Sequence, residues 1–406
     1  MTTATSLAYH KKTIAPPAKT RISSIDLLRG LVMLIMAIDH LRDMLHLGHP
    51  NPTNLQTTTP ALFFTRWITH FCAPTFVFLS GISAFLAGKR RTREEMAGFL
   101  IKRGLWLLLV ELLIINFATT VDPFYHAITL QVIWAIGGSM ILLGLLVWAK
   151  AGPRVIGGIG LIIFLGHNVI DLLHNKAIDT QLVWRLLLSS RGFTAIDSLG
   201  GGHFLLVAYA LVPWTGVMLV GYSLGILYTK EAGQRKRILT TIALSLLAFF
   251  VLFRALNFYG DPAPWSVQRN AVLTVISFLN VTKYPCSLLY LCMTLGVTLL
   301  ILANTENVGN RFARILIVYG NVPFFYYVLH WFLAQAITIT LFFSTGHHLN
   351  DTNQDMTAFP FSPNNFGLPL AGLYMVWLFL ITVLYFPCRW FGQYKRSHKQ
   401  WWLSYL

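Results

Sequence analysis

The sequence predicts an all-α fold, a polytopic bundle of about ten transmembrane helices. Hydrophobic residues make up 55% of the 406 residues and mean hydropathy is +0.60, whereas charged residues make up 11%, against about 25% in soluble domains. Several apolar runs reach roughly 20 residues, the length that crosses a bilayer. A soluble protein of this composition would expose large apolar patches, so soluble, collagenous, disordered and disulfide-scaffold classes are excluded.

The elements follow in order from the N-terminus. Residues 1–24 are basic and polar, and we expect a cytoplasmic segment that does not pack. The apolar run from Leu27 has no small-residue cleavage site, so it is interpreted as a retained helix rather than a signal peptide. A transmembrane domain is expected over 25–390, followed by a cytoplasmic tail at 391–406. Hydropathy places the spans at approximately 27–47, 62–87, 100–120, 128–149, 154–172, 204–228, 238–257, 284–303, 313–343 and 366–388.

The distribution of Lys and Arg predicts the orientation of the bundle. With the N-terminus inside, the cytoplasmic segments hold 23 of the 31 Lys and Arg residues and the opposite side holds 8. Cytoplasmic loops carry such an excess, so both termini are predicted inside. Much of the net charge of +16 therefore comes from the Lys and Arg residues that set the orientation. The sequence contains no soluble module rich in basic and aromatic residues, so a nucleic-acid partner is not expected.

No metal or redox motif is visible. The four cysteines fall in or beside apolar runs without a C-x-x-C pair, so we expect buried hydrophobic side chains. No Glu-x-x-His helix and no His/Cys set has the spacing of a metal site, so no metal is proposed. Most of the 13 histidines and many Asp residues fall on the predicted outer side. That surface suits a hydroxyl- and amine-rich ligand, although solvated loops explain the loop acids equally well.

The first predicted helix holds the densest set of ionisable residues, and each such residue costs at least ~2.5 kcal/mol inside a bilayer. Arg29 and His40 are eleven residues apart, which is about 1,100° of rotation, so both side chains point the same way with a rise of roughly 16 Å. Arg binds phosphate in a fork and His transfers protons near neutral pH, so this face suits an acyl-CoA threaded along it. An anchoring Arg29 and a hydrogen-bonding His40 are the structural alternatives.

Six segments in this order resemble the membrane-bound heparan-alpha-glucosaminide N-acetyltransferase family. The first, from Arg21, matches the family's opening Arg-x-x-Ser-x-Asp-x-x-Arg-Gly followed by a Met-containing apolar helix. Residues 73–86, Ala-Pro-Thr-Phe-Val-Phe-Leu-Ser-Gly-Ile-Ser-Ala-Phe-Leu, look like the family's second helix. The segments that fit the bacterial branch are 131–140, 283–296, 321–330 and 401–406, so the likeness covers nearly the whole chain from about residue 21.

The resemblance implies an integral-membrane acyltransferase that moves acetyl from cytosolic acetyl-CoA to a hydroxyl or amine of an extracytoplasmic glycan, in a bacterial inner membrane. Bacterial relatives in the wider group use an Arg, ten intervening residues and a His, which matches Arg29 and His40. The human-type lysosomal enzyme has Asn in place of His40 and its reactive His farther on. His46 and His49 lie near that place, with Asn51 eleven residues after His40, so the loop histidines stay alternatives to His40.

The roles expected in the reaction follow from residue type and spacing. His40, oriented by Asp39 or Asp43, deprotonates the acceptor or transiently carries the acetyl group. Asp43 is favoured because it lies three residues from His40 on nearly the same helix face. Arg29, with Lys102 and Arg103, is expected to hold the CoA phosphates, while lipid headgroups are the alternative for the latter two.

Four further residues are expected to bind the acceptor. Arg66 and His70 lie four apart on one face of the second span, where an interfacial Arg is the alternative. Glu111 in the third span and His330 in the ninth are membrane-embedded, and structural pairing or packing is the alternative for each.

Two other functions compete with acyl transfer. One is a proton-coupled transporter or flippase in which His40, Glu111 and His330 relay protons, but no internal repeat is evident. The other is a receptor or scaffold without chemistry. Expected partners are membrane lipid and the glycan acceptor, and the oligomeric state, including a homodimer, stays open.

Overall fold

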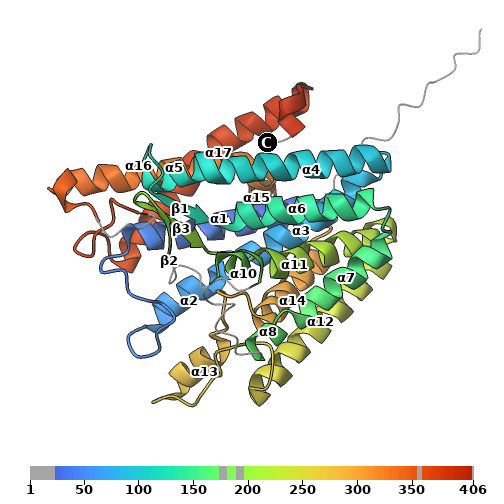
Figure 1. Cartoon of the computed structure of the whole chain (residues 1–406), viewed down its shortest axis with the longest axis horizontal. Coiled ribbons are helices and arrows are strands. Elements are labelled where there is room, and N and C mark those ends of the chain that lie inside the picture. The colour runs from blue at the N-terminus through green and yellow to red at the C-terminus, as the bar shows by residue number, and fades with distance from the viewer. Residues whose placement is uncertain (1–22, 173–180, 189–195, 354–358, 405–406) are drawn as a thin grey trace, which may run out of the picture.

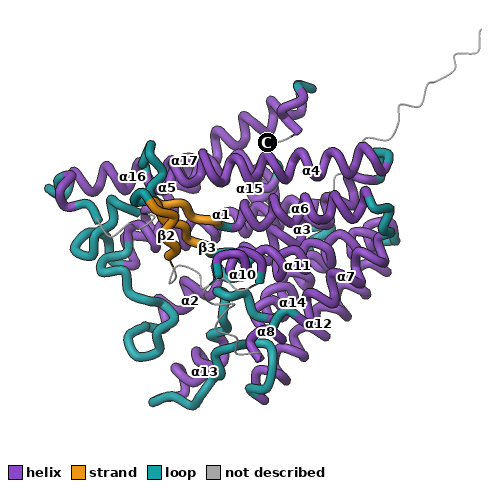
Figure 2. Tube along the Cα trace, in the orientation of Figure 1, coloured by secondary structure: helices purple, strands orange, loops and turns teal. Residues whose placement is uncertain are grey.

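The computed structural model describes residues 23–172, 181–188, 196–353 and 359–404 (Figure 1). Helices dominate, and many of them lie side by side, with short turns at one end of the bundle and longer loops at the other (Figure 2). Nearly all of the predicted N-terminal segment, residues 1–24, lies outside the described residues. The last helix continues to Ser397, past the predicted domain boundary at 390.

The described elements are mainly helices joined by turns and loops. The first half contains α1 (Ser23–Leu45), α2 (Pro60–Thr69), α3 (Cys72–Gly88), α4 (Arg93–Val110), the π-helical turn η1 (Glu111–Ile115), α5 (Asn116–Thr120), β1 (Ala127–Leu130), α6 (Val132–Trp148), α7 (Pro153–Gly166), α8 (Val169–Leu172), α10 (Leu182–Leu187) and β2 (Ile196–Gly200). The second half contains β3 (His203–Val207), α11 (Leu211–Leu224), η3 (Gly225–Thr229), α12 (Ala232–Leu256), α13 (Ala271–Leu279), α14 (Leu288–Asn304), α15 (Arg311–Gly320), α16 (Pro323–Ser344), η4 (Leu349–Asp351), α17 (Leu370–Ser397) and η5 (Trp401–Ser404).

Five helical segments in the described parts of the chain are long and apolar enough to cross a membrane. Three shorter apolar helices, α6, α7 and α14, accompany them. α1 is 23 residues long but carries five Asp and Arg residues spread along its length, and it is not among these segments. The five segments are Pro60–Gly88, Leu211–Thr229, Ala232–Leu256, Pro323–Ser344 and Leu370–Ser397.

The all-α prediction is wrong in one respect, because a small three-stranded sheet closes one end of the bundle (Figure 2). β1 pairs in parallel with β3, and β2 pairs antiparallel with the other edge of β3. β1 and β3 directly precede apolar helices, so hydropathy merges each strand with the helix that follows. Their pairing joins Ala127 to Phe204, and a contact so distant in sequence leaves no local signal.

The predicted ninth span divides at residues 321–322 into α15 and α16. α15 lies against α1 at two glycines that permit backbone contact. A Cβ added at Gly30 would lie 1.9 Å from the carbonyl oxygen of Leu316, and one added at Gly320 would lie 1.8 Å from that of Asp26. Small residues allow helices in membranes to approach this closely.

α1 forms the centre of the bundle. Leu28, Met33, Ala37, Leu41 and Met44 are each at most 1% exposed, and α2, α3, α14, α15, α16 and α17 all contact this helix. The four cysteines are buried and unpaired, as predicted. α1 is therefore enclosed by other helices over much of its surface.

Candidate active site

Two cavities lie end to end along one face of α1. The large cavity has a volume of about 690 Å³ and the small cavity of about 310 Å³. Arg29 and Met33 line the small cavity, and Met36, His40 and Asp43 line the large one. These positions follow the three- and four-residue steps of a single helix face. The predicted common face of Arg29 and His40 is thereby confirmed.

The large cavity lies along the C-terminal half of α1. Its walls come from α1, α2, α3, the first residue of α6, the loops near 46–53 and 280–284, and α16. His40 and the two loop histidines considered as alternatives to it, His46 and His49, all line this cavity, and so does Asn51. The predicted site residues that it brings together are Asp39, His40, Asp43, Arg66 and His70.

His40 is oriented by a second histidine. Its Nδ1 lies 2.7 Å from Nε2 of His330, which is fully buried behind it. His330 Nδ1 contacts the carbonyl oxygen of Tyr327, and because a carbonyl only accepts, this nitrogen carries the proton. In the neutral His330 ring, Nε2 then accepts from His40 Nδ1–H, which leaves the lone pair of His40 on Nε2.

The indole of Trp331 fixes the plane of the His40 ring. The two rings are stacked with their centroids 4.0 Å apart and an interplanar angle of 16°. Trp331 itself is 1% exposed, so it is an immobile platform. A proton acceptor held by a hydrogen bond on one edge and a stacked ring on one face is preorganised for chemistry.

The structure contradicts the prediction that Asp43 orients His40. Asp43 is hydrogen-bonded to the neighbouring Arg42, and its side chain is 37% exposed. The long guanidinium of Arg42 reaches both this carboxylate and that of Asp39, 2.9 Å away. A carboxylate beside a charge-complementary fork pairs with it in preference to a neutral imidazole.

Asp39 likewise binds cations rather than His40. Its carboxylate is hydrogen-bonded to Arg66 and lies 3.8 Å from Nζ of Lys283, in addition to its contact with Arg42. These three cations exceed the two carboxylates of Asp39 and Asp43, so this wall of the cavity is net positive. The predicted proximity of Asp39 to the site is correct, but its role is to gather cations from α1, α2 and the 280–284 loop.

The structure orients neither the loop histidines His46 and His49 nor His70 as firmly as it orients His40. His46 Nδ1 contacts the carbonyl of Leu47, and His49 Nε2 lies 3.2 Å from the hydroxyl of Ser362. His70 is 1% exposed, and within the described residues its Nδ1 has no hydrogen-bond partner. His70 therefore presents an unsatisfied buried nitrogen at the cavity.

Glu111, predicted to bind substrate, lines neither cavity. One of its oxygens, Oε1, accepts from the backbone N–H of Gln131, the residue that precedes α6. Asn116, one π-helical turn onward, accepts from the N–H of Thr129 and donates to its carbonyl. Glu111 and Asn116 together secure the junction of β1 and α6, which satisfies backbone groups that the membrane interior leaves without water.

The small cavity lies along the N-terminal half of α1 and has cationic residues in its lining. Arg29 is hydrogen-bonded to Ser83 and lies 3.4 Å from Asp26. Arg103 and Lys395 line the same cavity, together with Asn321, whose buried Oδ1 has no hydrogen-bond partner among the described residues. This combination of cations and amide suits phosphates and a polar linker. Lys102, predicted to join them, is exposed and lines neither cavity.

Lys283 and Trp331 both line the large cavity, but the sequence patterns did not identify either of them as a site residue. Lys283 looked like an ordinary loop charge, and its only local signal is its position beside an apolar helix. It is 8% exposed, and its Nζ lies 5.1 Å from the centroid of the Tyr284 ring. A buried Lys needs a specific environment, which here is formed by residues remote in sequence.

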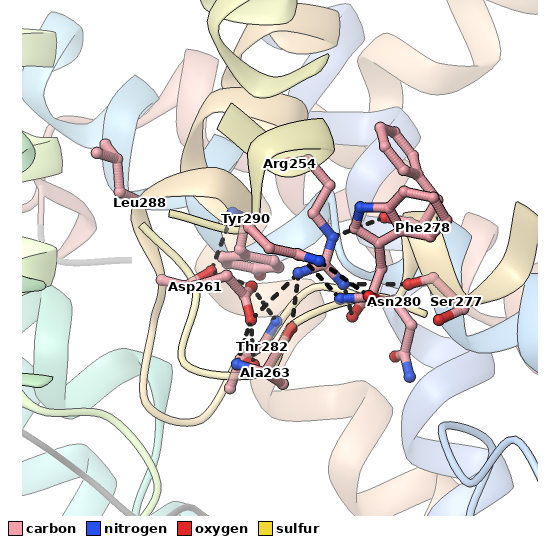
Figure 3. A network of polar contacts seen from close by, with 12 residues as sticks. Arg254, Asp261, Ala263, Ser277, Phe278, Asn280, Thr282, Leu288 and Tyr290 are labelled. Carbon is pink, nitrogen blue, oxygen red and sulfur yellow. Dashed lines mark hydrogen bonds and ion pairs between the residues drawn. The ribbon is translucent and has the colours of Figure 1, made fainter. Parts of the chain in front are cut away.

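A buried polar network holds the loop that carries Lys283 (Figure 3). Arg254 donates to the carbonyls of Ala263, Ser277, Phe278 and Asn280 at 2.7 to 3.1 Å. Asp261, 3.6 Å from Arg254, accepts from Thr282 and Ser287. The end of α12 is thereby tied to the wall of the large cavity, and the residues joined are Arg254, Asp261, Ala263, Ser277, Phe278, Asn280, Thr282 and Ser287.

Comparison with known families identifies the family of the chain. The family model for the catalytic region of heparan-alpha-glucosaminide N-acetyltransferase matches residues 21–262, more than half of the chain. The matched region contains α1 and both Arg29 and His40, and it ends before Lys283 and His330. A search among curated proteins finds no match. The chain belongs to the heparan-alpha-glucosaminide N-acetyltransferase family, and its catalytic region is that of a membrane acetyltransferase.

Proposed function

We propose that this protein transfers an acetyl group from cytosolic acetyl-CoA to a hydroxyl or amine of an extracytoplasmic glycan. The observation that carries the proposal is the single face of α1 that presents Arg29 to one cavity and His40 to the next. The proposal includes ten crossings of a bacterial inner membrane with both termini in the cytoplasm, in agreement with the Lys and Arg distribution.

The residues of the small cavity fit the donor. Arg29, Arg103 and Lys395 would bind its phosphates, and Asn321 would accept from an amide N–H of its linker. With the linker along α1, the thioester would reach His40. The acceptor would enter the large cavity, where Arg66 and Lys283 supply the net positive wall and the His70 ring offers a further polar contact.

His40 acts as the general base in the proposed reaction. Its Nε2 takes the proton of the acceptor hydroxyl or amine while the acceptor oxygen or nitrogen attacks the thioester carbonyl carbon. A C–O or C–N bond forms, the C–S bond breaks, and the departing thiolate takes the proton from His40 to leave as free thiol. His330 keeps Nδ1 of His40 protonated throughout, so that Nε2 remains the reactive nitrogen.

A proton-coupled transporter has less support. The relay considered for it includes Glu111 together with His40 and His330, but Glu111 accepts from a backbone N–H and lines neither cavity. The hydrogen bonds described for His330 join it to His40 and to a backbone carbonyl, so they suit orientation of a base.

The test uses full-length protein in proteoliposomes with radiolabelled acetyl-CoA and envelope glycans. We expect labelled glycan with wild type, a loss of about 10²- to 10⁴-fold in kcat for His40→Ala, and unchanged activity for the exposed control His348→Ala. Full transfer by a normally inserted His40→Ala protein contradicts the mechanism. Label retained covalently on wild type but not on His40→Ala would replace the direct route by an acetyl-histidine relay.

A second arm tests the donor site. Arg29→Gln removes one charge-assisted contact worth about 1.5–3 kcal/mol, so the KM for acetyl-CoA should rise about 10- to 150-fold. Unchanged KM and kcat would return Arg29 to an anchoring role. Activity only when acetyl-CoA is added on the side of the termini would support the proposed orientation, and activity from the opposite side alone would contradict it.

A further inference from the structure

The charged side chains that line the large cavity do not balance. Its cations are Arg42, Arg66 and Lys283, and its carboxylates are Asp39 and Asp43. Arg42 pairs with Asp43, and Arg66 pairs with Asp39. With neutral histidines, the described lining therefore has one positive charge in excess. Lys283 is the cation that these two arginine–carboxylate pairs leave over.

The ammonium group of Lys283 has donors to spare. It carries three N–H groups. Its Nζ lies 3.8 Å from Oδ2 of Asp39, which is longer than a hydrogen bond, and 5.1 Å from the centroid of the Tyr284 ring. Among the described residues, none accepts a hydrogen bond from this nitrogen. A ligand that displaces water from Lys283 therefore has to supply an acceptor, or the displacement costs affinity.

The loop fixes the backbone on which this cation stands (Figure 3). Thr282, the preceding residue, donates its backbone N–H and its hydroxyl to Asp261, both at 2.8 Å. The carbonyl of Asn280 accepts from Arg254 at 2.9 Å. Lys283 itself is 8% exposed, so its stem is packed as well. A cation held in this way loses less conformational entropy on binding than a mobile surface lysine does.

We infer that Lys283 binds an acidic group of the acceptor, a carboxylate or a phosphate, close to the hydroxyl or amine that is acetylated. This inference rests on the proposed function, because it places the acceptor in the cavity of His40. Lys283 and His40 line the same cavity, and Asp39, which Lys283 contacts, directly precedes His40. A bound acid would compensate the excess charge, whereas a neutral acceptor would leave the ammonium without a partner.

This contact is a property of the present chain. The family match ends at residue 262, so it implies nothing about Lys283. An ammonium is a point charge that suits carboxylate and phosphate alike. The two acidic groups therefore share one recognition chemistry, and the experiment has to distinguish them.

The experiment measures binding of glucose, glucuronate and glucose 6-phosphate to full-length protein in nanodiscs by ligand-observed NMR titration. Glucose is neutral, and the other two sugars carry a carboxylate or a phosphate at the same end of the ring. Lys283→Met removes the charge and Lys283→Arg keeps it. The matched control is Lys236→Met, at an exposed position of α12 that lines neither cavity. Acetyl-CoA binding is measured by calorimetry on the same samples, and Arg29→Gln reports on the small cavity.

We expect wild type and Lys236→Met to bind at least one acidic sugar about 10- to 150-fold more tightly than glucose. Lys283→Arg should keep most of this preference. Lys283→Met should lose it without losing affinity for glucose or acetyl-CoA. The sugar that is preferred identifies the acidic group as carboxylate or phosphate.

Equal affinity of wild type for all three sugars overturns the inference whether or not the variants fold, and it leaves the proposed function intact. A preference that persists in Lys283→Met also overturns it. So does a preference that Arg29→Gln abolishes, because the acid would then bind in the small cavity. If wild type binds no acetyl-CoA, the proposed function fails and the inference fails with it.

Discussion

Replacement of His330 tests the orientation of the catalytic base most directly. In His330→Ala, the Nδ1–H of the partly buried His40 loses its acceptor, and the ring is free to expose either nitrogen to the cavity. An unsatisfied buried donor costs about 1–3 kcal/mol, which corresponds to a decrease of about 5- to 150-fold in kcat if the cost falls on the productive orientation. The remaining base and the Trp331 platform should preserve activity above that of His40→Ala.

His330→Gln provides the matched rescue, because its side-chain oxygen accepts a hydrogen bond from His40 without titrating. Steady-state transfer at saturating acetyl-CoA should rank wild type above His330→Gln, His330→Ala and His40→Ala, with the KM for acetyl-CoA nearly constant. The reasoning would be refuted if His330→Gln were as impaired as His330→Ala in well-folded protein. An increase in KM for the acceptor with unchanged kcat would instead assign His330 to acceptor binding.

Three further substitutions test the structural supports of the site, each measured as thermal stability of detergent-purified protein. Gly30→Val should destabilise the protein by at least about 1–3 kcal/mol, because the new side chain meets the facing carbonyl of α15. Gly98→Val is the control and should be nearly neutral, because open space surrounds Gly98. Equal losses of stability in the two variants would contradict this contact. Arg254→Met leaves a buried carboxylate uncompensated and should cost about 3–5 kcal/mol, and a stable variant would show that the loop network is dispensable. Glu111→Gln should retain most of the stability, because the amide oxygen still accepts from the backbone N–H of Gln131. Glu111→Leu loses this acceptor and should cost about 1–3 kcal/mol. A reversed ranking of the two variants would argue against Glu111 as the acceptor that holds the start of α6.

Local properties of the chain were sufficient to predict the membrane class, the burial of the cysteines and the common face of Arg29 and His40. Composition reports the solvent that surrounds the helices, and the helical period relates positions within one continuous element such as α1. Neither depends on how the helices cross.

The partners of these residues depended on tertiary structure. Asp43 seemed the natural partner of His40, but helix packing brought His330 to it from almost 300 residues away and left Asp43 to Arg42. Glu111 accepts a hydrogen bond from a backbone N–H. Lys283 forms an ion pair with Asp39 because it lies on a loop anchored by Arg254. The strands and the division between α15 and α16 also emerged only in three dimensions. Residue type and spacing define what a side chain is able to bind, whereas the crossing of distant helices decides which of the competing partners lies within reach.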